Sequence, residues 1–220
     1  WQHRRWHYKT LRIKGFIMSI VTLNDRGVRS VTTFGSVSGG SMVFIKKLTA
    51  SSSASLSFVN GSSDVVLDST YKEYLFTFKN IHAATDGQQF RFQTSTDGGS
   101  SYGVTLTSTY FIAYHKEDGS EQALGYITGS DKAQSTDFMV LGSGDNENDS
   151  GISGFMNLFN PASTTFVKHY IARTINDPST YAQDEFTAGY FNTTSAINAV
   201  QFKFASGNID AGDICLYGIL

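Results

Sequence analysis

The feature that most constrains the fold of this chain is a series of short strand-like runs, which recur about every ten residues from Met42 onward. In the run Tyr74–Phe78, three aromatic side chains share one face. In Phe90–Thr94, two phenylalanines share a face, and Arg91 and Gln93 point the other way. A period of two is the pattern of a β-strand with one buried face. No segment shows ten or more residues of helical periodicity, so the sequence predicts an all-β fold, an antiparallel β-sandwich of jelly-roll type.

The expected strands are separated by clusters of Gly, Ser, Asn and Asp. They cover Met42–Leu48, Leu56–Val59, Tyr74–Phe78, Phe90–Thr94, Tyr110–His115, Ala123–Thr128, Phe138–Leu141, Phe155–Phe159, Phe166–Arg173, Val200–Phe204 and Asp213–Ile219. Asp-Gly pairs at Asp97 and Asp118 readily take the positive φ that tight hairpins need. Between Asn176 and Glu185 we expect at most one helical turn, after Pro178.

Three regions differ in composition. Residues 48–220 hold most of the strand pattern and are expected to form the sandwich domain. Residues 18–47 are interpreted as an arm or tether, because apolar residues are sparse before a Gly-Ser hinge; an irregular loop of the same domain is the alternative. Residues 1–17 are interpreted as a basic leader from upstream read-through, because Met18 resembles an ordinary protein start. A processed basic arm is the other interpretation.

The distribution of charge argues against a nucleic-acid partner. Residues 1–17 contain five of the 17 basic residues and no acid, so residues 18–220 carry 12 basic and 19 acidic residues, a net charge of −7. A surface of that sign repels phosphate. No stretch approaches the roughly 18 apolar residues of a membrane helix, so we also expect no membrane insertion.

The sequence lacks the signature motifs of hydrolases. The nearest match to a Gly-x-Ser-x-Gly nucleophile elbow, Gly35–Gly39, has valine in place of the nucleophile. There is no His-Glu-x-x-His zinc motif and no phosphate-binding loop. We therefore expect a protein that is not an enzyme. A glycan-cleaving or glycan-binding sandwich of the concanavalin-like type is the alternative, since paired carboxylates can cleave glycosidic bonds.

An acidic loop, Gly144–Gly151, is the best candidate for a metal site. Asp145, Glu147 and Asp149 alternate with asparagines, and flexible loops rich in oxygen ligands are what calcium prefers. The loop lacks the EF-hand order, because Met156 stands where a bidentate acid belongs. We expect a solvated loop and no required cofactor, with calcium as the alternative.

Sugar binding is the ligand class that the composition favours. Aromatic rings stack on the apolar faces of sugars, and polar side chains bind their hydroxyl groups. Tyr181 follows a predicted loop and precedes Gln183 and Asp184, and Tyr190 and Asn192 offer the same combination further along. These five residues are the candidate ligand-binding set. The alternative is that the tyrosines pack within the sandwich or at a subunit interface.

Several blocks resemble virion structural proteins of marine tailed bacteriophages, of the tail-fibre-like or capsid-associated kind. The blocks are Tyr74–Asp86, Phe92–Tyr102, Thr109–His115, Leu158–Tyr170 and the ending Ser206–Ile219, and the resemblance covers roughly Leu48–Ile219. It implies a virion component that contacts other virion proteins and recognises a glycan on the host surface. It supplies no catalytic residues.

The resemblance and the single cysteine together favour an assembly of several copies. Cys215 is the only cysteine, so an internal disulfide is excluded. A durable particle protein without disulfides must gain stability from a large core or from oligomerisation. We therefore expect a homo-oligomer, with a trimer favoured.

Overall fold

The computed structural model describes residues 41–178 and 180–220, which form thirteen β-strands and no helix. The strands are β1 (Met42–Thr49), β2 (Leu56–Val59), β3 (Glu73–Ala83), β4 (Gln88–Ser95), β5 (Leu106–Lys116), β6 (Gln122–Tyr126), β7 (Lys132–Ser135), β8 (Met139–Gly144), β9 (Ile152–Phe159), β10 (Lys168–Asn176), β11 (Tyr181–Phe191), β12 (Ala199–Phe204) and β13 (Ile209–Ile219). This part of the chain thus offers no helix that could cross a membrane.

The leader predicted at residues 1–17 and residues 18–40 of the predicted arm lie outside the described residues. The last residues of that predicted arm belong to a strand. They form most of β1, which pairs with β13 and so joins the sheet of the sandwich.

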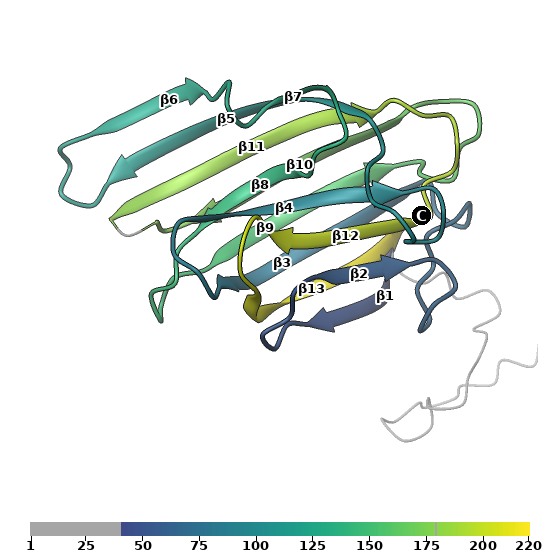
Figure 1. Cartoon of the computed structure of the whole chain (residues 1–220), viewed down its shortest axis with the longest axis horizontal. Helices are drawn as coiled ribbons and strands as arrows, with labels where there is room; N and C mark the ends of the chain where they lie inside the picture. The colour runs from purple at the N-terminus through teal and green to yellow at the C-terminus, as the bar shows by residue number, and fades with distance from the viewer. Residues whose placement is uncertain (1–40, 179) are drawn as a thin grey trace, which may run out of the picture. The chain divides into compact units, whose positions relative to one another are not determined.

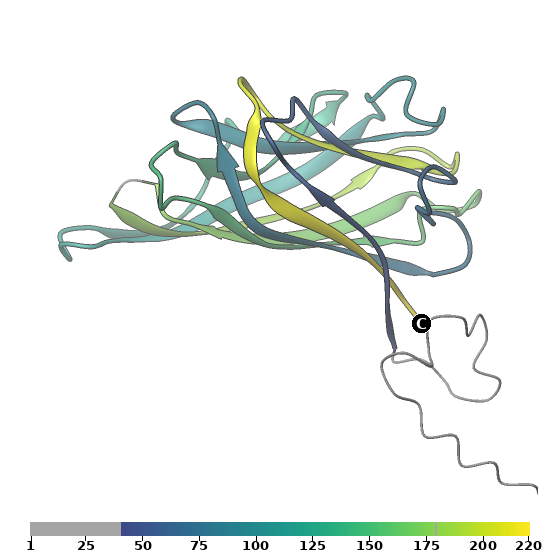
Figure 2. The same ribbon diagram turned by 90° about the horizontal axis from the view of Figure 1, so that it is seen from below.

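The strands form two antiparallel sheets that pack face to face (Figures 1 and 2). The larger sheet has nine strands, in the order β1-β13-β3-β9-β10-β11-β5-β6, with β7 also pairing with β5. The smaller sheet has four strands, in the order β2-β12-β4-β8. The predicted all-β antiparallel sandwich is confirmed, whereas its assignment to the jelly-roll type stays a prediction.

An aromatic cluster fills the space between the two sheets. Phe202 of β12 is at its centre, and its ring centroid lies 5.3–6.3 Å from those of Phe58, Phe76, Phe78, Phe90 and Phe92. All six side chains are at most 3% exposed. Burying each one favours folding by about 1.5–3 kcal/mol, so this cluster contributes to the cohesion between the sheets. The core faces predicted for Tyr74–Phe78 and Phe90–Thr94 are therefore confirmed.

Three local expectations differ from the structure. Gln93 points away from the core, as predicted, yet it is fully buried. Its amide donates hydrogen bonds to the carbonyls of Thr136 and Asp137 at 3.0 Å, which satisfies the buried polar group. Phe166 precedes β10 rather than belonging to it, and it is 67% exposed. The segment around Tyr181 begins an eleven-residue strand, β11, instead of a helical turn.

Besides pairing with β4, the edge strand β8 is held by side chains of the larger sheet. Thr187 donates to the carbonyl of Val140 at 3.1 Å, and Thr174 donates to that of Leu141. Asn176 donates to the carbonyl of Ser143. Buried backbone groups need such partners, so these polar side chains let the smaller sheet end inside the sandwich.

Candidate functional site

The smaller sheet ends at β8, and the larger sheet continues past it with β11, β5 and β6 (Figure 1). Within residues 41–178 and 180–220, part of the inner face of the larger sheet is therefore left without a second layer. Ile112, Tyr114, Tyr181 and Gln183 lie there, half-buried, and line an open groove of about 470 Å³. The other lining residues are Gly87, Ser143, Asp145 and Pro178, which come from the turn after β3, from β8 and from the loops that follow β8 and β10.

The floor of the groove is aromatic, and the strand register explains why. Alternation along β5 places Ile112, Tyr114 and Lys116 on one face, and β11 pairs with β5 so that Tyr181 lies opposite Lys116. The rings of Tyr114 and Tyr181 meet edge to face, with their centroids 5.5 Å apart. The Lys116 ammonium lies 5.3 Å from the centroid of the Tyr181 ring, a cation–π contact that helps to orient the ring.

A small polar network fixes the outer end of this floor. The hydroxyl of Tyr114 donates to Glu121 at 2.6 Å, and Lys116 pairs with the same carboxylate at 3.2 Å. These contacts stabilise the charged form of Glu121 and hold its pKa below the ordinary value. Interactions with Tyr181 and Glu121 raise the pKa of Lys116, so the pair stays ionised at neutral pH.

A buried carboxyl group lies beneath the groove. Glu185 is fully buried, and it accepts hydrogen bonds from the backbone of Ser143 at 2.8 Å, from the amide of Gln183 at 2.8 Å and from the hydroxyl of Tyr110. Loss of hydration disfavours the charged form and raises the pKa of Glu185 to about 8, although the hydrogen bond from Ser143 acts in the opposite direction. At neutral pH Glu185 is mainly a neutral acid, linked to the groove lining through Gln183.

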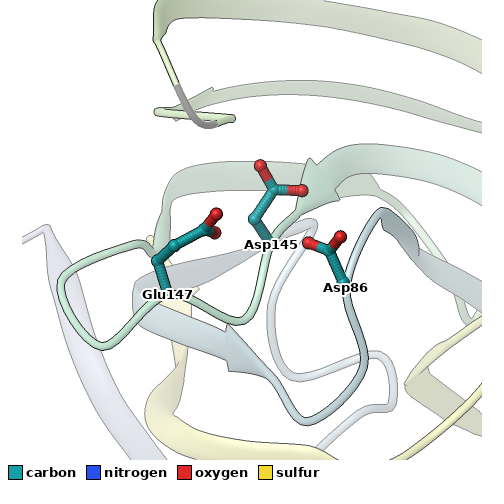
Figure 3. Close-up of side chains that lie close together, drawn as sticks. All are labelled: Asp86, Asp145 and Glu147. Carbon is teal, nitrogen blue, oxygen red and sulfur yellow. The ribbon is translucent and has the colours of Figure 1, made fainter.

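Three carboxylates gather beside the groove (Figure 3). Asp86 comes from the turn between β3 and β4, and Asp145 and Glu147 come from the loop after β8, with ligand oxygens within 4.8 Å of one another. Asp145 is 8% exposed and also lines the groove, whereas the other two are exposed. Oxygen ligands at this spacing could hold a hard cation such as calcium, and exposed acids also gather in this way without one.

The structure brings together only some of the residues predicted from the sequence. Of the ligand-binding set, Tyr181 and Gln183 line the groove. Asp184 lies on the opposite face of β11, where it pairs with Arg173 at 2.5 Å. Tyr190 and Asn192 lie at the other end of β11, roughly 30 Å away at 3.3 Å per residue, and both contact Gln134.

Of the predicted metal set, Asp145 and Glu147 meet and Asp149 does not join them. Asp149 lines a separate polar hollow of about 610 Å³, together with residues that include His82 and Asp177. Sequence reasoning missed Asp86, which is about sixty residues from the acidic loop in the chain. The predicted ligand-binding set also lacks Tyr114, which lines the groove. Only the pairing of β5 with β11 places it next to Tyr181.

No protein-family model, no curated protein and no solved structure matches this chain.

Proposed function

We propose that this chain is a glycan-binding β-sandwich that carries its ligand in the groove beside β8. The observation that carries the proposal is the floor of that groove, where the rings of Tyr114 and Tyr181 lie next to the polar groups of Gln183 and Asp145. Ring faces pack against the C–H faces of sugars, and amide and carboxylate groups bind their hydroxyls. This pairing of an aromatic surface with hydrogen-bonding groups is the arrangement that sugar recognition needs.

The charges around the groove favour a neutral glycan. Asp86, Asp145 and Glu147 gather on one side of it, and the positive charge of Lys116 is already paired with Glu121. An anionic sugar would meet like charges there, which disfavours binding. A neutral hexose chain, whose hydroxyl groups can donate to Asp145 in the lining, fits these charges better.

We further propose that the protein acts on a phage particle, as a tail-fibre-like or capsid-associated component that attaches to a host glycan. The support for this placement is the resemblance of its strand blocks to virion structural proteins. A sandwich with a large aromatic core and no disulfide suits a particle protein. In this proposal its other partners are further virion proteins.

Binding without cleavage is the form of the proposal that the groove supports best. Retaining and inverting glycosidases use two carboxyl groups that flank the bond to be broken. Among the described residues that line the groove, Asp145 is the one acid, and Glu185 is enclosed beneath the lining. A glycan-cleaving activity would need a second acid to reach the bound sugar.

A glycan array followed by calorimetric titration of the full chain tests the proposal. We expect the variant Tyr181→Ala to weaken binding of a neutral glycan by about tenfold, because one stacking contact is worth roughly 1.4 kcal/mol. The matched control is Tyr190→Ala, a tyrosine of the same strand at the other end, which should bind like the wild type. No binding to any neutral glycan, or equal losses in the two variants, would contradict the proposal.

The same titration in EDTA and in calcium chloride determines whether the cluster of Asp86, Asp145 and Glu147 contributes. Affinity that is unchanged by EDTA assigns binding to the groove residues alone. Affinity that is lost in EDTA and restored by calcium assigns a bound cation to the cluster.

A further inference from the structure

An exposed apolar patch covers the outer face of the larger sheet, on the side away from the core. Six large apolar side chains form this outer-face patch, and their exposed fractions run from 37% to 74%: Phe111, Leu124, Tyr126, Phe155, Ile171 and Ile175. Two further exposed residues, Met42 and Phe44, lie on the edge strand β1 and are not counted in the patch. Most of the large exposed apolar side chains in the described part of the chain therefore share one face.

The strand register makes this patch continuous. Tyr126 pairs with Phe111, Phe111 with Phe186, Phe186 with Arg173, and Arg173 with Phe155, in a row that crosses β6, β5, β11, β10 and β9. Phe111 and Phe186 stack at 4.7 Å with nearly parallel rings, and the guanidinium of Arg173 lies 4.9 Å from the centroid of Phe186. These contacts order the side chains of three neighbouring strands along the row.

The size of the patch matches a protein interface. A large side chain exposes roughly 200 Å² when it is free, so the six exposed fractions amount to roughly 600 Å² of surface. That is at the upper end of the patches found on monomers and close to the roughly 800 Å² that each partner contributes to a stable complex. Aromatic residues and arginine, both present here, are also the types enriched in interfaces.

The patch carries one charge of each sign, so its charges can match those of a second copy of the same patch. Arg173 and Asp184 stand next to each other within it, 55% and 23% exposed, and they give it one positive and one negative group. Nucleic acid would need an excess of positive charge, which this face does not offer. A second identical face, turned by a two-fold rotation, can instead place its Asp184 against Arg173 and its rings against these rings.

We propose that the outer-face patch binds the same patch on a second copy of this chain, so that two larger sheets pack face to face. Such an interface is closed after two copies. The trimer favoured by the sequence would need a different, head-to-tail contact. Each copy would keep its groove open, because the groove lies on the inner face of the same sheet.

Sedimentation of the full chain over a range of micromolar concentrations tests this proposal. We expect a dimer for the wild type and an association weakened at least about tenfold by Phe155→Asp, which places a charge within the patch. The matched control is Phe166→Asp, which makes the same change at an exposed phenylalanine outside the patch and should leave the dimer intact. A wild-type chain that stays monomeric, or equal behaviour of the two variants, overturns the proposal. If Phe155→Asp does not fold by circular dichroism, Ile171→Asp makes the same test from a side chain that is 52% exposed.

A mixing experiment identifies the occupant as a second copy. Arg173→Asp gives a patch with two acids and Asp184→Arg a patch with two basic groups, so each variant alone should repel itself and remain largely monomeric. Mixed in equal amounts, the two should associate at least about tenfold more strongly than either alone, because each patch then meets the opposite charge. If the mixture associates no better than the separate variants, the faces do not meet and the proposal fails.

Discussion

Glu185 is the residue whose chemistry departs furthest from that of a free side chain. Its carboxyl group is buried between β8, β5 and β11, and its pKa is raised from 4.5 to about 8. Between those two pH values the folded chain holds one proton that the unfolded chain has released. The free energy of unfolding must therefore fall as pH rises through this window, and the contribution of Glu185 is fully present only below about pH 4.5.

We expect this fall to approach about 1.4 kcal/mol per pH unit between about pH 5 and pH 8, and the variant Glu185→Gln to remove most of it. Glutamine keeps the acceptor for Ser143 and carries no charge to desolvate. Urea unfolding of the wild type and the variant at several pH values measures both slopes. The control is Glu121→Gln, at an exposed site with a lowered pKa, and its free energy of unfolding should still fall with rising pH as in the wild type. An equal slope in the wild type and Glu185→Gln would show that Glu185 is not the titrating group.

At the scale of the element, strands with an apolar inner face could be predicted from the sequence and strands with a polar inner face could not. In β3 and β4 the buried positions are aromatic, so a period of two was visible. In β11 the inward positions near its start are Gln183, Glu185 and Thr187, which serve the groove and the edge of β8. Because these inward positions are polar, the sequence there shows no alternation of apolar and polar residues that would predict a strand. Asp86 was missed because nothing within its own turn indicates the loop it meets.

The last strand, β13, contains a bulge that depends on one glycine. Gly212 has φ of +116° at the register shift between Ala211 and Asp213, and a Cβ atom there would overlap the carbonyl oxygen of Asn80. We expect Gly212→Ala to lower the free energy of unfolding by about 2 kcal/mol or more, through backbone strain and the clash. Gly125→Ala in β6, where no atom lies within 4 Å of the new Cβ, is the control and should change stability by less than about 0.5 kcal/mol. Urea unfolding compares the two variants. Equal free energies of unfolding would contradict the prediction that Gly212 is needed for the bulge.

At the scale of the whole molecule, the unequal size of the two sheets explains both proposed surfaces. Nine strands face four, so among the described residues the inner face of the larger sheet is uncovered beyond β8, and none of these residues form a layer over its outer face. The sandwich itself could be predicted from spacing and composition. The groove could not, because it depends on which strand ends the smaller sheet.

The two proposed surfaces lie on opposite faces of the larger sheet, so they should act independently. We expect the monomeric variant Phe155→Asp to bind glycan with an affinity within about twofold of the wild type, since distant sites are energetically additive. Calorimetric titration of that variant measures the effect. A large loss of affinity would mean that the groove is complete only in the assembled form.

The most direct test of glycan binding in the groove is a nuclear magnetic resonance titration with ring-labelled tyrosine. Of the eleven tyrosines, Tyr114 and Tyr181 line the groove, whereas Tyr190 lies at the far end of β11 and Tyr126 on the outer face. On addition of a neutral glycan selected by the array, we predict shifts in the ring signals of Tyr114 and Tyr181 and none in those of Tyr126 and Tyr190. Shifts confined to Tyr126 or Tyr190, with Tyr114 and Tyr181 unchanged, would contradict the account.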